Sequence, residues 1–381
     1  MSKQINLDIP KGWNQCSTAQ LEAIAAITRE QIERVDRYHP FSMQKVKIAL
    51  FFLFAGLKVE TYPDPRLRIG EQFYNVSRAS QRKRSWFHKL PFVKSHPFAK
   101  ISFSKSFPFV KISFGKTKDS SRDYFSLYLW QITYWLAPKA KTDDKSSPEY
   151  ITQGLGILDW LDVESGIYLT RFPYPFLRLR LHLFGRSKEF KGPSIDLDGF
   201  SWQQYRFASD MMQTYTRLSN NLIKMQQMDK FTEEQLMIQA DSVMSARKMF
   251  LAIIFNAKTD YIDSVTGMKK HDFHYEAGQF TANSEYFSKI SENQWQVVLF
   301  WWSGITHTLA HRYPHVFKVQ ELKNQKPLSP LEIYSATTAT MQKYAGLTED
   351  QVNTQSYSLV LEHLERLSVE NEEMEKIRRN K

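Results

Sequence analysis

The sequence predicts a mainly α-helical fold with a small β insertion at about residues 165–200 and a protruding basic arm or hairpin at about residues 78–118. Three observations predict it. Apolar residues recur at helical spacing over most of the chain. Only 14 glycines and 15 prolines occur in 381 residues, which is few for a turn-dense all-β protein. Hydrophobic residues make up 42% and charged residues 24%, which provides for a buried core and excludes wholesale disorder.

Residues 1–77 are predicted to form an N-terminal helical part. Ser17 or Thr18 caps the first helix, which ends at Pro40. A second helix lies between Ser42 and Gly56 and is apolar nearly all round, which is typical of a buried helix. After this helix regularity is lost, because prolines and a glycine interrupt the chain.

Residues 78–118 form a basic arm. Ten lysines and arginines and no acidic residue lie between Gln72 and Thr117, whereas the net charge of the whole chain is +11. The stretch 97–105 is repeated at 108–116, and its alternation predicts a hairpin with one apolar and one cationic face. The residues predicted to contact a partner are Arg82, Lys83, Arg84, Trp86, Lys94, Lys100, Phe103, Lys105, Lys111, Phe114 and Lys116.

Three interpretations of the basic arm remain open at this point. It is a tolerated surface insertion lengthened by duplication of a short repeat, since loops accept insertions at little cost. It binds nucleic acid, since cations interleaved with aromatic rings suit phosphates and bases. Or it binds an acidic protein surface.

Residues 119–347 are predicted to form a central helical body with the small β element. Alternating leucines and cations between Leu177 and Leu183 predict a strand, and Ile167–Leu169 suggest another. Residues 258–292 are predicted to be a loop. The predicted helices cover residues 122–136, 148–162, 201–227, 232–255, 293–311 and 329–346.

Residues 348–381 are predicted to hold one long C-terminal helix, from Glu349 to about Arg379. Its 3–4 spacing predicts an apolar seam that packs on the protein's own body or pairs two copies in a homo-oligomer. An asparagine in such a seam sets the register of a helix pair. The seam residues are Tyr357, Val360, Leu364, Leu367, Asn371 and Met374.

The sequence carries no recognisable catalytic motif. A phosphate-binding loop, a dinucleotide-binding fingerprint and a nucleophile elbow are all missing. Two histidine groups have residue types that bind metals: His307, His311 and His315, and His271, Asp272, His274 and Glu276. Packed or solvated side chains are the alternative for both. We therefore expect no catalytic residue, cofactor or metal, and a protein that is not an enzyme.

The single cysteine, Cys16, excludes an internal disulfide and a cysteine-based metal site, and it suits a reducing cytoplasm. The N-terminus lacks the apolar core of a secretory signal. The longest apolar stretch, 295–310, is shorter than the ~20 residues of a membrane span. We expect a cytoplasmic protein without a membrane segment.

Several stretches together resemble a known group of proteins. They are Ile9–Trp13 leading to Thr18–Leu21, Leu53–Lys58, Trp202–Phe207 and Tyr344–Thr348, about a third of the chain. The set resembles uncharacterised proteins that tailed phages and prophages of gut anaerobes encode near the tail tape-measure gene. The resemblance implies a tail assembly chaperone or a minor structural protein, located in the cytoplasm of the host cell or associated with the virion, and it implies no individual functional residue. The basic arm does not belong to this pattern.

A tape-measure chaperone has to be helical and to cover a long apolar helix until assembly. Methionines gather in two adjacent predicted helices, and methionine surfaces adapt to varied partners, although core packing is the alternative. These methionines are Met211, Met212, Met225, Met228, Met237, Met244 and Met249. The leading hypothesis is thus a phage assembly protein that binds a phage structural or tape-measure protein. The alternative is a nucleic-acid-binding accessory protein that uses the basic arm.

Overall fold

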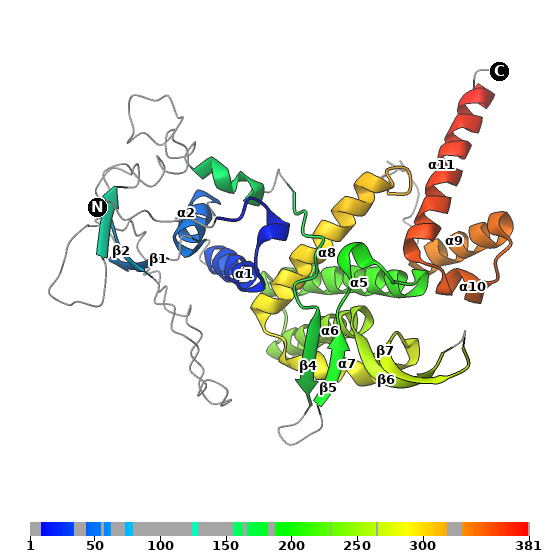
Figure 1. Cartoon of the computed structure of the whole chain (residues 1–381), viewed down its shortest axis with the longest axis horizontal. Coiled ribbons are helices and arrows are strands. Elements are labelled where there is room, and N and C mark those ends of the chain that lie inside the picture. The colour runs from blue at the N-terminus through cyan, green and yellow to red at the C-terminus, as the bar shows by residue number, and fades with distance from the viewer. Residues whose placement is uncertain are drawn as a thin grey trace. The chain divides into compact units, whose positions relative to one another are not determined.

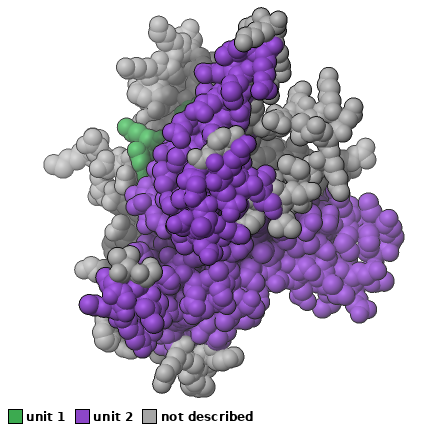
Figure 2. All heavy atoms as spheres, turned by 90° about the vertical axis from the view of Figure 1, so that its right-hand side faces the viewer, with its two compact units in different colours: residues 1–168 green, residues 169–381 purple. Residues whose placement is uncertain are grey.

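The computed structural model describes residues 9–33, 43–54, 57–61, 73–78, 124–128, 155–162, 166–181, 187–228, 230–263, 266–317 and 330–379. The protein is mainly α-helical, as the sequence predicts, and its described residues also form two small antiparallel sheets (Figure 1). The chain divides into two compact units, Met1–Tyr168 and Leu169–Lys381 (Figure 2). Apart from Arg78, the basic arm lies outside the described residues, and its hairpin stays a prediction.

The described residues of unit 1 contain two α-helices, two short 3-10 helices, of which η1 is Trp13–Gln15, and a three-stranded antiparallel sheet in the order β1-β2-β3. Helix α1 begins at the predicted residue, while its predicted end at Pro40 lies outside the described residues. Helix α2 lies within the predicted bounds and is buried on most sides, because it is apolar nearly all round. Their bounds are α1 Thr18–Glu33, α2 Met43–Phe54 and η4 Leu155–Leu161, with strands β1 Leu57–Thr61, β2 Phe73–Arg78 and β3 Tyr124–Tyr128.

Strand β3 lies where the sequence predicts a helix, so that prediction is wrong. Its residues Tyr124 to Tyr128 pair in register with β2, from Phe73↔Tyr128 to Ser77↔Tyr124. Aromatic residues favour strands, and pairing with a neighbouring strand overrides a weak helical pattern. The predicted helix at 148–162 appears in the described residues as the 3-10 turn η4.

A buried lysine joins η4 to α2 inside unit 1. The Lys47 ammonium donates to Asp159 Oδ1 at 2.5 Å and to Asp162 Oδ2 at 2.8 Å. Burial by itself would lower the pKa of Lys47, but the hydrogen bonds to both carboxylates outweigh it and raise the pKa. The two aspartates therefore belong to a structural ion-pair cluster.

Unit 2 is built around three long helices, α5, α6 and α8, with a four-stranded antiparallel sheet of order β4-β5-β6-β7. The strands are β4 Phe176–Arg180, β5 Ser187–Lys191, β6 Asn256–Ile262 and β7 Lys269–His274. The helices are α5 Trp202–Gln226, α6 Glu233–Ile254, α7 Phe280–Ser284, α8 Glu292–Arg312, α9 Pro330–Ala345, α10 Glu349–Thr354 and α11 Tyr357–Arg379, with 3-10 turns η6 Ile195–Leu197 and η8 Glu285–Lys289.

The sheet extends beyond the predicted insertion. Strands β4 and β5 lie within residues 165–200 as predicted, but β6 and β7 form a hairpin in the region 258–292 that was predicted to be a loop. The hairpin turns at Gly267, whose φ of 67° favours glycine. Its amide donates to the Asp263 carbonyl at 2.8 Å. A polar, exposed hairpin has no continuous apolar face, so its sequence resembles a loop.

The core of unit 2 is aromatic and centres on α8. Trp295 and Trp301 are almost fully buried, and the Phe172 ring lies 4.6 Å from that of Trp301. Gly304 permits a close approach, because a Cβ there would lie 2.5 Å from the Leu169 carbonyl oxygen. The predicted helix at 293–311 is confirmed.

The C-terminal helix is divided in two at Gln355 and Ser356. There the chain pairs with the start of α5: the Trp202 amide donates to the Gln355 carbonyl at 2.7 Å, and Ser356 bridges Ser201. Burial raises the pKa of Tyr357 to about 12. Its hydroxyl stays protonated and donates to the Asp196 carbonyl. These contacts fix the first turn of α11 on the body of unit 2.

Candidate protein-docking surface

Helices α5 and α6 form an antiparallel helical hairpin whose ends are well capped. Ser201 Oγ accepts the Gln204 amide at the start of α5. Thr232 and Gln235 form a reciprocal capping box at the start of α6, as the sequence predicts. Between the helices, Gln239 Nε2 donates to the Leu218 carbonyl at 2.8 Å.

The proximal half of this hairpin, residues 202–212 and 246–254, lies in the core. Buried side chains include Trp202, Tyr205 and Met212 from α5 and Phe250 from α6. Burial raises the pKa of Tyr205, whose ring lies 5.4 Å from that of Tyr357. The proximal half thus anchors the hairpin to the rest of unit 2.

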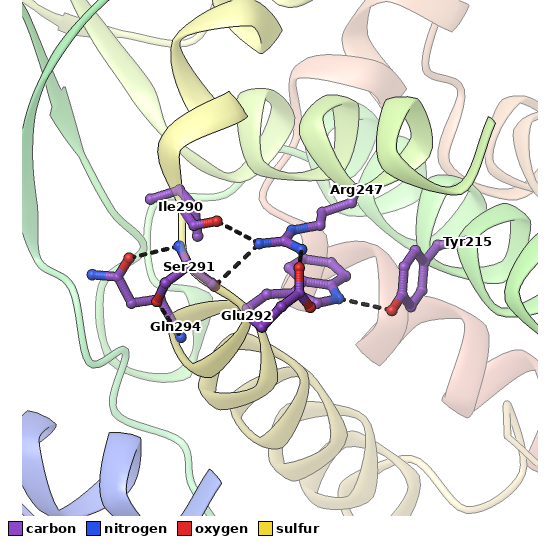
Figure 3. Close-up of polar contacts among 7 residues, drawn as sticks. Tyr215, Arg247, Ile290, Ser291, Glu292 and Gln294 are labelled. Atoms are coloured by element: carbon purple, nitrogen blue, oxygen red, sulfur yellow. Dashed lines mark hydrogen bonds and ion pairs between the residues drawn. The ribbon is translucent and has the colours of Figure 1, made fainter. Parts of the chain in front are cut away.

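Arg247 fixes the proximal half to the start of α8 (Figure 3). Its guanidinium is buried, pairs with Glu292 and donates to the Ile290 carbonyl at 2.6 Å and the Ser291 carbonyl at 3.1 Å. The guanidinium carbon also lies 5.4 Å from the Trp295 ring centroid. The cation therefore finds partners in the place of the water that burial removes.

The start of α8 is also fixed by its own capping box and by a hydrogen bond to α5. Ser291 and Gln294 form a reciprocal capping box, with distances of 3.0 and 3.2 Å. Trp295 Nε1 donates to the Tyr215 hydroxyl at 2.8 Å, which joins α8 to α5 (Figure 3). These contacts make the base of the hairpin rigid.

The distal half of the hairpin, residues 213–245, differs sharply. No side chain among its described residues is fully buried. Large apolar side chains are nevertheless exposed on both helices and at the turn between them. They are Ile223 at 52%, Met228 at 46%, Met237 at 62%, Ile238 at 61% and Met244 at 41% exposure. We call these five residues the distal apolar surface.

The outer stripe of α5 in the distal half also lacks charge. Thr216, Asn220, Ile223 and Gln227 follow one another at helical spacing and are all exposed. Interface cores are depleted in charged residues and enriched in methionine. This stripe of α5 therefore has the composition of a docking surface, although exposed charged residues such as Arg217 and Lys224 lie beside it.

The methionines that the sequence analysis identifies fall into two groups, buried or half-buried ones and exposed ones. Met212 is buried, and Met211, Met225 and Met249 are half-buried, so these four contribute to packing. Met228, Met237 and Met244 are exposed. Ile223 and Ile238 were missed by sequence reasoning. What could have identified them is their place on each helix, next to the face that packs on the other helix of the hairpin.

The seam of α11 changes character along the helix. Tyr357 and Val360 are buried, Leu364 and Leu367 are half-buried, and Asn371 and Met374 are exposed. The first part of the seam thus packs on unit 2, while pairing of copies through the outer part stays a prediction. All eleven contact residues predicted in the basic arm, from Arg82 to Lys116, lie outside the described residues.

The two histidine groups take part in local contacts. His271 Nδ1 lies 2.6 Å from Asp260 Oδ1, and His274 stacks on Tyr261 with ring centroids 4.1 Å apart. His315 Nδ1 lies 2.5 Å from Glu365 Oε1. Within the described ranges, no three His, Cys, Asp or Glu side chains gather as they would around a metal ion.

Comparisons with known proteins add no family and no relative to these geometric observations. None of the helices in the described part of the chain has the length and apolar character needed to cross a membrane. No protein-family model matches the chain, and neither the curated proteins nor the solved structures searched contain a match.

Proposed function

We propose that this chain is a non-enzymatic protein of phage tail or virion assembly, and that its distal apolar surface binds an apolar helix of another phage protein. The expected partner is the tape-measure protein or a minor structural protein. The observation that carries the proposal is the exposure of five large apolar side chains on the half of the hairpin that lacks fully buried residues. The phage context rests on the resemblance described above.

The energetics favour binding over folding as the role of these side chains. Full burial of one Ile or Met side chain contributes about 1.5–3 kcal/mol relative to exposure. At 62% and 61% exposure, Met237 and Ile238 retain most of that contribution for a partner. An amphipathic helix that lies along a helical surface provides such burial through residues at i, i+3, i+4 and i+7.

The base of the hairpin supports the same role. Arg247 and the capping contacts at α8 hold the proximal half in place, so the distal surface is presented on anchored helices. A preorganised surface loses less conformational entropy on binding than a mobile one. Unbranched methionine side chains still adapt to the partner's shape.

The test is co-purification from host cells in which the phage or prophage is induced. The variant Met237→Gln/Ile238→Gln removes two central apolar side chains of the surface. Ile195→Gln is the matched control, because Ile195 is 62% exposed but lies in η6, outside the hairpin.

We expect the wild-type protein and the control to retain a tape-measure or other phage structural protein and the double variant to lose it. Failure of the wild-type protein to retain any phage structural protein contradicts the proposal. Equal retention by all three proteins contradicts the assignment to the hairpin.

A further inference from the structure

The four-stranded sheet of unit 2 has one face that is covered at β5 and an opposite face that is open. On the covered face, Phe190 of β5 is fully buried against Phe287 of η8, with ring centroids 4.9 Å apart. Lys188 on the same face donates to Asn283 of α7 at 2.8 Å. Strand alternation and register place the opposite set of residues on the other face.

We call this other side of the sheet the open face. In β4 the alternation of exposure confirms it, because Phe176, Arg178 and Arg180 are exposed while the residues between them are half-buried. The long side chains that register assigns to the open face are Phe176, Arg178, Arg180, Glu189, Lys191, Lys258, Asp260, Ile262, Lys269, His271 and Phe273.

Two aromatic rings from opposite edges of the sheet meet on the open face. Phe176 of β4 and Phe273 of β7 have ring centroids 5.9 Å apart. Phe176 is 63% exposed, and Phe273 is half-buried. The Lys258 ammonium lies 5.9 Å from the Phe273 centroid. The pair presents an aromatic platform to solvent with a cation beside it.

The open face is also positively charged. Five lysines and arginines lie on it with two acidic residues, Glu189 and Asp260. Glu189 lies between two of the cations, 3.9 Å from Arg178 and 3.6 Å from Lys258. Arg178 and Lys269 have side-chain exposures of 69% and 72%, so both remain accessible to a ligand.

We propose that the open face binds single-stranded nucleic acid. Unpaired bases stack on exposed aromatic rings, and phosphates interact with surrounding lysines and arginines. The platform of Phe176 and Phe273 supplies the first contact, and the cations of β4, β5 and β6 supply the second. A duplex hides the faces of its bases, and an acidic peptide uses only the charges. The aromatic pair therefore favours an unpaired strand. This site is separate from the hairpin surface of the proposed function.

The test compares full-length protein binding to a fluorescent oligothymidylate and to a duplex of equal length by anisotropy. Phe176→Ala/Phe273→Ala removes the platform. Ile262→Ala is the matched control, because Ile262 is 74% exposed at the far end of the same face. The basic segment 78–118 is present in every protein, so its contribution cancels when the affinity of each variant is compared with that of the wild-type protein for the same ligand.

We expect the wild-type protein and the control to prefer the single strand, and the double variant to lose about 5-fold to 100-fold in single-strand affinity with duplex affinity unchanged. Phe176→Trp should retain the preference, because its larger ring still stacks. An oligouridylate of equal length serves as a second ligand and distinguishes RNA from DNA.

Three results would overturn the proposal. One is equal binding of single strand and duplex by the wild-type protein. Another is an undiminished single-strand preference in a folded double variant, with folding checked by circular dichroism. The third is displacement of the oligonucleotide by polyglutamate to the same extent in wild type and double variant, which would assign the face to an acidic protein.

Discussion

The two halves of the α5–α6 hairpin belong to the same pair of helices and differ in what their apolar residues do. In the proximal half, side chains such as Phe250 and Tyr205 are buried among the aromatic residues of α8 and α11. In the distal half, Ile223, Met237 and Ile238 are each more than half exposed. Apolar residues recur in both halves, but only in the proximal half are some of them fully buried.

The two halves show that the amphipathic spacing of apolar residues along a helix and the burial of those residues are separate properties. A helix needs tertiary neighbours to bury its apolar face. Tyr215, at the start of the distal half, still contacts Trp295 of α8, but no described side chain from there to residue 245 is fully buried. Scattered exposed apolar residues are ordinary, and the proposed binding role rests on the occurrence of five of them on one helical hairpin.

Phe250→Ala in the proximal half should give the largest loss of stability. Phe250 is fully buried, and its ring lies 5.2 Å from that of Trp302. We expect the free energy of unfolding to fall by about 3–5 kcal/mol, because a cavity replaces the ring. Urea denaturation followed by tryptophan fluorescence measures the change, and a loss below ~1 kcal/mol would place Phe250 outside the stabilising core.

Arg247→Ala should give the next largest effect. The substitution removes the pair with Glu292 and leaves the Ile290 and Ser291 carbonyls without the guanidinium donor. We expect a loss of about 2–3 kcal/mol, the scale of hydrogen bonds to a charged group. Lys248→Ala is the neighbouring control: it removes one pair, to Glu285, and should cost less than ~1 kcal/mol.

The contact between α11 and the segment after α8 should depend on pH. Burial alone would raise the pKa of Glu365, but hydrogen bonds from His315 and the Val316 amide lower it below the ordinary 4.5. A depressed carboxylate pKa gives stability that is present above pH 4.5 and is lost as the pH falls through the folded-state value.

Amide hydrogen exchange over this acid range measures the loss of protection at the start of α11. Glu365→Gln should abolish the pH dependence, because the amide side chain does not titrate. A variant that keeps the same acid-induced loss would assign the effect to another group.

Met237→Ala in the distal half should have the smallest effect. The side chain is 62% exposed, so its removal creates no cavity, and we expect the free energy of unfolding to change by less than ~0.5 kcal/mol. The same urea titration measures it. A loss of unfolding free energy as large as that of Phe250→Ala would contradict the difference between the two halves of the hairpin.

The sequence predicts the helices well and the sheet in part. Capping residues such as Thr232 and Ser42, together with long apolar periodicity, place α2, α5, α6 and α8 near their observed bounds. Strands β6 and β7 were missed because the hairpin is polar and largely exposed, and without a buried face it shows no clear alternation. The sequence predicts a helix where β3 lies, because aromatic residues occur in both helices and strands.

The candidate docking surface was predictable only in outline. Composition identifies the methionines of two adjacent helices, but it does not separate buried Met212 from exposed Met237, because both lie in amphipathic helices. Whether a methionine is buried depends on how far along the hairpin the rest of unit 2 packs against the two helices. The open face of the sheet was not predictable, because it depends on a register between β4, β5, β6 and β7 that local sequence does not specify.

Partner retention by the Met237→Gln/Ile238→Gln variant, measured alongside its free energy of unfolding, tests the central claim most directly. The account predicts loss of the phage structural partner with unfolding free energy within ~0.5 kcal/mol of wild type. A variant that unfolds more readily by several kcal/mol, or that stays stable and still retains the partner, would contradict it.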